Sequence, residues 1–158
     1  MNNLPDQLKA ILTESETRTA MANRIVQAIR SSGDYRWVGL YDVKFEVGLV
    51  SNIAWSGPSA PAYPDFPITK GLTSRAITER RTVNVGDVAD DPNYLTALDS
   101  TRSEIIVPVL DDARNVVGTI DIESAELNAF DHSAESFLED CAGVLKAFWT
   151  ITSQPGED

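Results

Sequence analysis

The chain has 158 residues, of which 42% are apolar and 23% charged, and this composition argues against disorder, collagen and coiled coil. Its formal net charge of −11 arises in the second half, because residues 1–79 carry eight basic and eight acidic side chains whereas residues 80–158 carry five and sixteen. An acidic surface of this kind argues against nucleic acid and anionic membranes as partners.

One cysteine and one histidine are too few for a disulfide framework or a zinc cluster, so we expect neither a metal ion nor a cofactor. The longest apolar run covers residues 105–110, far short of the roughly 20 residues that span a bilayer. The first thirty residues carry repeated charges and no apolar core of signal-peptide length. We therefore expect a protein of the cytoplasm.

Helical periodicity opens the chain, with apolar residues spaced by three and four over residues 4–30. A break is expected near Thr13–Ser15, where either of these two residues would cap a second helix. Gly33 suits the end of this helical segment, which we place at residues 1–32.

The later elements follow from changes in periodicity. They are hairpin strands at 37–41 and 47–55, a stiff proline-rich loop at 58–67, a helix at 72–80, a strand at 82–85, an irregular loop at 87–99, strands at 105–110 and 116–124, and a helix at 131–151 capped by Asp131. No repeat or linker divides the chain, so we expect one domain over residues 1–158 with a frayed tail at 153–158. Strands in hairpins favour an α+β fold with a mostly antiparallel sheet, one face covered by long terminal helices and the loop side left for a pocket.

An acidic cluster is the most informative chemical feature. On the strand that contains them, Asp121 and Glu123 face away from the isoleucines, and an antiparallel hairpin turned at 111–115 would bring Glu104 beside them. Asp99 lies a few residues before that strand. Carboxylates held close raise one another's pKa, which a bound ammonium group or a shared proton would relieve. The alternative is a solvent-facing strand with screened charges, and spacing alone leaves both open.

Candidate nucleophiles are scarce. Cys141 falls in the apolar stripe of the last predicted helix, four residues after Phe137, so we expect it to lie in the core. His132 sits at the first turn of that helix, where the dipole disfavours its charged form. The chain has no phosphate-binding glycine loop, dinucleotide fingerprint or metalloprotease helix, so no catalytic residue is assigned.

Several short motifs occur in a specific order. They are Trp37-Val38-Gly39-Leu40-Tyr41, Lys70-Gly71-Leu72, Val85-Gly86-Asp87-Val88, Ser103-Glu104-Ile105 and Thr119-Ile120-Asp121-Ile122-Glu123-Ser124. With this order and spacing the chain resembles a GAF domain over residues 35–148. The resemblance implies an antiparallel sheet of about five to six strands flanked by helices, a ligand pocket under the loops, and homodimers formed through the terminal helices.

Among GAF domains the chain is most similar to the free methionine-R-sulfoxide reductases. That resemblance implies that Glu104, Asp121 and Glu123 line the ligand pocket, Glu123 standing where the family has an aspartate. The reductases act through cysteines, and this chain has Leu98 and Thr73 at two of those positions and no cysteine in residues 59–67, which cover the third. Sulfoxide reduction by a thiolate needs a nucleophilic sulfur that these positions lack.

These observations favour a stand-alone GAF protein of regulatory or sensory function that binds a small amine-bearing metabolite. Its carboxylates would hold the ammonium group, and Asp99 would cap the pocket from the loop. The apolar side of the pocket would be formed by Trp37 or Tyr41 together with Trp55 or Tyr63. Two alternatives remain, a divergent reductase that uses Cys141 or an external thiol, and a structural or interaction domain with no ligand.

Overall fold

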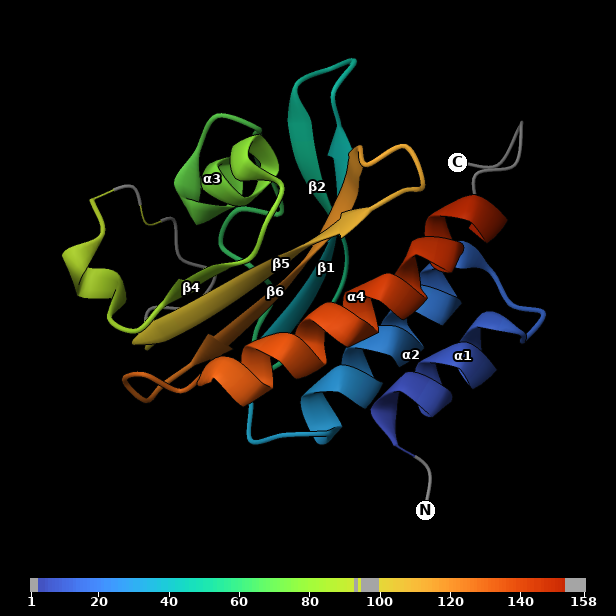
Figure 1. The fold of residues 1–158 in the computed structure, drawn as a ribbon, viewed down its shortest axis with the longest axis horizontal. Coiled ribbons are helices and arrows are strands. Elements are labelled where there is room, and N and C mark those ends of the chain that lie inside the picture. The colour runs from blue at the N-terminus through green and yellow to red at the C-terminus, as the bar shows by residue number, and fades with distance from the viewer. Residues whose placement is uncertain (1–2, 93, 95–99, 153–158) are drawn as a thin grey trace.

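The computed structural model describes residues 3–92, 94 and 100–152, and Figure 1 shows a curved sheet with helices on both faces. The elements in chain order are α1 (Leu4–Leu12), α2 (Arg18–Ser31), β1 (Trp37–Lys44), β2 (Leu49–Ser56), β3 (Asp65–Pro67), α3 (Gly71–Glu79), β4 (Val83–Val85), the 3₁₀ turn η1 (Val88–Asp90), β5 (Ser103–Leu110), β6 (Val116–Ser124) and α4 (His132–Thr152). None of the described helices is long and apolar enough to cross a membrane.

The sheet has six strands in the order β3-β2-β1-β6-β5-β4, and every neighbouring pair is antiparallel. This confirms the predicted fold class. The proline-rich segment is not wholly a loop, because residues 65–67 form the short edge strand β3 against β2. Prolines are tolerated there, since an edge strand leaves one row of backbone groups without a ladder partner.

The helical segment at the N-terminus breaks where the periodicity predicted, but the cap is a different residue. Helix α1 ends at Leu12, and Thr17 caps α2 by accepting a hydrogen bond from the Ala20 amide at 3.1 Å. The prediction that Thr13 or Ser15 caps the second helix was wrong. At the other end Asp131 caps α4 as predicted, accepting from the Ala134 amide at 2.8 Å.

The main core lies between the sheet and helices α1, α2 and α4, which Figure 1 shows together on one face. Alternation along the strands builds this core, because residues such as Leu40, Ile120 and Ile122 point toward the helices and are fully buried. Cys141 is buried there too, as the sequence predicted. The opposite face of the sheet is covered by α3 and the loops, and it carries the functional candidates.

Arg18 of α2 and Trp149 of α4 both bind the carboxylate of Asp42 on β1, which joins these two helices to the sheet. Both terminal nitrogens of Arg18 donate to this carboxylate, at 2.7 and 2.9 Å, and the indole nitrogen of Trp149 donates at 2.9 Å. The indole ring also requires a glycine beneath it, because a Cβ at Gly118 would lie 2.0 Å from the ring. The terminal helices are therefore positioned by specific contacts as well as by apolar packing.

Candidate functional site

Three carboxylates meet on the sheet face that lies away from the terminal helices. One oxygen each of Glu104, Asp121 and Glu123 lies within 4.8 Å of the others. Their exposed fractions are 1%, 7% and 0%. The prediction that the two strands bring these residues together is confirmed, and the alternative of a solvent-facing acidic strand is wrong.

The sheet register explains this arrangement. Glu104 of β5 and Trp37 of β1 lie directly across from Glu123 of β6, on either side of it. Two residues along, Asp121 lies between Ile106 and Gly39. Side chains at directly opposed positions of an antiparallel pair have Cβ atoms about 5 Å apart, so the register forces the carboxyl groups together.

The hydrogen bonds of the cluster are incomplete. The hydroxyl of Thr101 donates to Oε1 of Glu123. By contrast, Oε1 of Glu104 and Oδ1 of Asp121 are buried and have no hydrogen-bond partner among the described residues, and neither has the hydroxyl of Thr119 on the same strand face. Buried carboxylate oxygens without a donor are costly, so these two atoms mark a place suited to a cationic hydrogen-bond donor.

Burial changes the protonation of the cluster. Removal from water raises the pKa of Asp121 to about 6, while a hydrogen bond from Glu104 works in the opposite direction. Burial, followed by the charges of Asp121 and Glu123, raises the pKa of Glu104 well above its usual range. Like charges this close cannot all ionise without cost, and the structure therefore favours a proton on Glu104 that is donated to Asp121 at neutral pH.

Two of the predicted aromatic residues lie beside the carboxylates. Trp37 is fully buried and its ring lies over Gly39, where a Cβ would come within 2.4 Å of the ring. Its indole nitrogen donates to the carbonyl of Ser59 at 3.0 Å, which ties the loop after β2 to this face. Burial, and then the charges of the three carboxylates, raise the pKa of Tyr41 well above its ordinary value. Tyr41 is therefore a neutral neighbour of the cluster.

The other predicted site residues are placed differently. Trp55 is partly buried and packs with the aromatic group of Trp37 and Tyr41. Tyr63 is about half exposed and lines a separate cavity. Asp99 lies outside the described residues. Thr101 was missed by the sequence analysis, because a threonine two residues before a strand carries no signal of a contact across the sheet.

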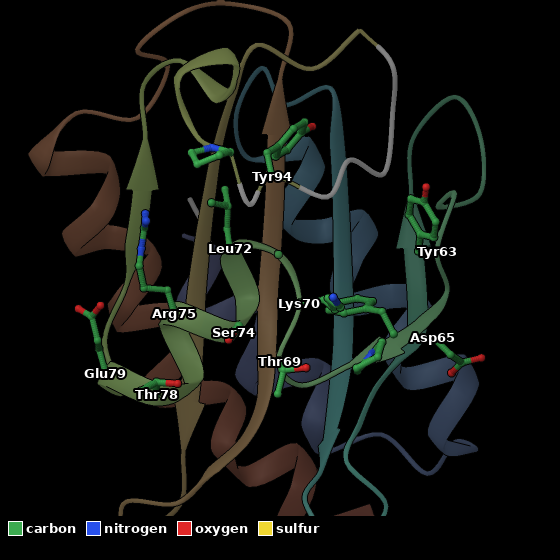
Figure 2. Close-up of a pocket in the computed structure, with 14 residues that line it drawn as sticks. Tyr63, Asp65, Thr69, Lys70, Leu72, Ser74, Arg75, Thr78, Glu79 and Tyr94 are labelled. Atoms are coloured by element: carbon green, nitrogen blue, oxygen red, sulfur yellow. The ribbon is translucent and has the colours of Figure 1, made fainter.

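The cavity that Tyr63 lines has a volume of about 770 Å³, within the usual range for small-molecule pockets. Figure 2 shows α3 along one side of it and Tyr63 and Asp65 along the other. Its lining residues are Tyr63, Asp65, Phe66, Pro67, Thr69, Lys70, Gly71, Leu72, Ser74, Arg75, Thr78, Glu79, Pro92 and Tyr94. The cavity is amphipathic, with aromatic rings and charges of both signs.

Apolar side chains connect this cavity with the acidic cluster. Leu72 and Tyr94 line the cavity and belong to the same apolar cluster as Ile106, which lies opposite Asp121 in the sheet. From the other side, the ring of Phe66 in the cavity wall packs edge-on against Tyr41 at a centroid distance of 5.8 Å. One layer of side chains therefore borders both the cavity and the carboxylates.

Thiol chemistry has no support at this site. The single cysteine, Cys141, lies in α4 on the helical face of the sheet, and burial raises the pKa of its thiol to about 12, with a smaller contribution from Asp140. Thr73 is buried on α3. The resemblance to the reductases places one of their cysteines at this position. Leu98 lies outside the described residues.

A GAF domain family model matches residues 15–146 of this sequence. The chain belongs to the GAF domain family. It is 29% identical over 143 residues to GAF domain-containing protein A of Dictyostelium discoideum, covering 90% of this chain and 88% of that protein. It is 33% identical over 114 residues to the free methionine-R-sulfoxide reductase of Saccharomyces cerevisiae, covering 71% of this chain and 62% of the yeast protein.

Solved structures agree with this assignment. The free methionine-R-sulfoxide reductase of Neisseria meningitidis in complex with its substrate superposes with a TM-score of 0.85 at 25% identity, covering 96% of this chain and 89% of that one. The type II reductase of Thermoplasma acidophilum gives a TM-score of 0.76 at 30% identity, covering 89% and 94%. The predicted resemblance to GAF domains and to these reductases is confirmed.

Proposed function

We propose that this GAF protein binds a small metabolite bearing a primary ammonium group, such as a free amino acid or its sulfoxide, and acts as a binding module. The observation that carries the proposal is a pair of buried carboxylate oxygens, Oε1 of Glu104 and Oδ1 of Asp121, that have no donor within the part of the chain that the structure describes. An ammonium group supplies three N–H donors and a positive charge to such a place.

The charge balance supports the same ligand class. No ion pair recorded among the described residues involves Glu104 or Asp121, although the chain places Lys and Arg side chains against other carboxylates. Burying like charges without a counter-charge costs folding free energy, and a ligand cation would offset that cost. The buried aromatic residues Trp37 and Tyr41 would form the apolar wall beside the ammonium, as in most small-molecule sites.

A second candidate is catalysis, supported by the similarity to free methionine-R-sulfoxide reductases. The buried thiol of Cys141 is on the wrong face of the sheet for the carboxylates, so a reductase of this sequence would need an external thiol. A reductant-coupled assay with both epimers of free methionine sulfoxide tests this candidate. Turnover that survives Cys141→Ala would assign the reducing sulfur to the added thiol.

A third candidate is a structural or interaction domain that takes no ligand. Under any of the three, we propose that the protein works as a homodimer formed through its terminal helices. Size-exclusion chromatography with light scattering would measure this oligomeric state. The ligand screen described next separates the third candidate from the first, because a domain that takes no ligand gains no stability from an added metabolite.

The first experiment is a thermal-shift screen with free amino acids, methionine sulfoxide epimers, polyamines and cyclic nucleotides. A ligand at 100 times its Kd adds about 2.7 kcal/mol of stability, which for a chain of this size raises Tm by about 5–10 °C. The double variant Glu104→Gln/Asp121→Asn should fold and lose this shift, whereas the exposed Asp112→Asn should keep it. Unchanged ligand affinity in the double variant would refute the carboxylate site, and silence across the whole screen would refute the binding function.

A further inference from the structure

The acidic cluster brings together more buried carboxyl groups than the donors recorded among the described residues satisfy. Three buried carboxyl groups share a space in which their oxygens lie within 4.8 Å of one another. The donor recorded for them from outside the cluster is the neutral hydroxyl of Thr101, which serves Glu123. Among the described residues, Oε1 of Glu104 and Oδ1 of Asp121 have no donor at the same place. Repulsion at this distance in a poorly solvated site is large compared with thermal energy.

We propose that the cluster binds its ligand by exchanging a proton for a primary ammonium group, so that occupancy of the site depends on pH. This inference rests on the proposed function and adds the ligand's hydrogen-bonding class and the regulation of the site. In the free protein a proton shared by Glu104 and Asp121 offsets part of their negative charge. When the ammonium enters, that proton leaves to solvent and the carboxylates accept the ligand's N–H groups.

Among the described residues, the elements packed around the cluster contribute few groups that could balance its negative charge. Strand β1 contributes the neutral hydroxyl of Tyr41, which also interacts with Asn52. Helix α3 packs on β5 through apolar residues, and its Arg75 is engaged by Asp91 at 3.1 Å. The proton is thus the counter-charge that the described surroundings provide. The raised pKa values of Glu104 and Asp121 agree with this reading.

The exchange also defines which cations fit. A primary ammonium can donate to both oxygens that lack partners, whereas a quaternary ammonium of the same charge has no N–H to donate. Methylammonium and tetramethylammonium are therefore a matched pair of probes. The first should displace the proton and the second should not, because the charge alone leaves the buried oxygens unsatisfied.

The test follows the carboxyl carbons of the cluster by ¹³C NMR during a pH titration of the full chain, assigned with Glu104→Gln and Asp121→Asn. In the free protein at least one of these carboxyls should titrate near pH 6 or above. Saturating methylammonium should lower that midpoint by one unit or more, equivalent to at least tenfold weaker proton binding, and tetramethylammonium should leave it unchanged.

The outcomes separate this inference from the proposed function. If all cluster carboxyls of the free protein titrate below pH 5, or if methylammonium leaves the midpoint unchanged, proton exchange is refuted while an amine found in the thermal screen would still support the binding module. If no amine binds in the screen, the binding module is refuted and the exchange with it, even where the free protein shows a high midpoint.

Discussion

Replacing Asp121 by Asn should stabilise the protein without ligand, by an amount that depends on pH. The pKa of Asp121 rises from 3.8 to about 6 on folding, because burial disfavours the charged form. One pKa unit corresponds to about 1.4 kcal/mol, so ionised Asp121 costs the folded state about 3 kcal/mol. Asparagine has nearly the same shape and cannot ionise, which removes this cost.

The sign of the pH dependence follows from proton linkage. The folded state binds the Asp121 proton more tightly than the unfolded state, so this residue's favourable contribution is complete below pH 3.8 and is lost as the pH rises to about 6. The stability difference between Asp121→Asn and wild type should therefore be small at pH 4 and reach about 3 kcal/mol at pH 7.5. Comparing the two proteins cancels titrations that they share.

The assay is urea denaturation followed by tryptophan fluorescence, since the chain has three tryptophans and Trp37 is fully buried. Asp112→Asn is the matched control, because Asp112 is an exposed carboxylate whose pKa is lowered by Lys146. This control should lose a little stability at neutral pH and never gain any. An Asp121→Asn protein that is less stable than wild type at pH 7.5, with the same pH dependence, would refute the reasoning.

Three further predictions concern the rest of the fold. Gly118→Ala forces a methyl group against the Trp149 ring and should destabilise the protein by about 3 kcal/mol in urea, whereas Gly143→Ala, where nothing lies within 4 Å, should stabilise α4 by about 1 kcal/mol. Asp42→Ala removes three charge-assisted hydrogen bonds and should cost about 3 kcal/mol in the same assay. Cys141 should resist a thiol reagent at pH 8 in the native protein and react fully after unfolding, and fast native labelling would contradict its placement in the core.

Elements with strong periodicity could be predicted from the sequence. The alternation on either side of Ile120 and Ile122 identified the core face and the acidic face of β6 together, because a strand has a period of two. The α2 cap was misplaced because Thr13, Ser15 and Thr17 are equally suitable caps by residue type. The structure distinguishes Thr17 by its extended backbone and by the hydrogen bond that its side chain accepts from the Ala20 amide.

The candidate site was predictable where it depends on register and not where it depends on loops. Pairing β5 with β6 through a short turn fixes Glu104 opposite Glu123, so the cluster could be anticipated from spacing. The burial of the cluster could not be anticipated from spacing, because it arises from α3 and the loops that cover this face of the sheet. Tyr63 shows the same limit, since its place in the proline-rich loop carries no periodic signal and it lines the separate cavity.

The energetics of the cluster argue that its role lies outside folding. Three buried acids stabilise a protein only when donors or cations satisfy them, and here oxygens of Glu104 and Asp121 have none among the described residues. Neutral residues at these positions would fill the same space without the ionisation cost. The same cost favours binding of a cation, because a ligand that neutralises the carboxylates offsets the free energy that their burial costs the folded state. Greater stability and weaker amine binding should therefore appear together in Asp121→Asn, and a variant that gained one without losing the other would separate the cluster from the ligand.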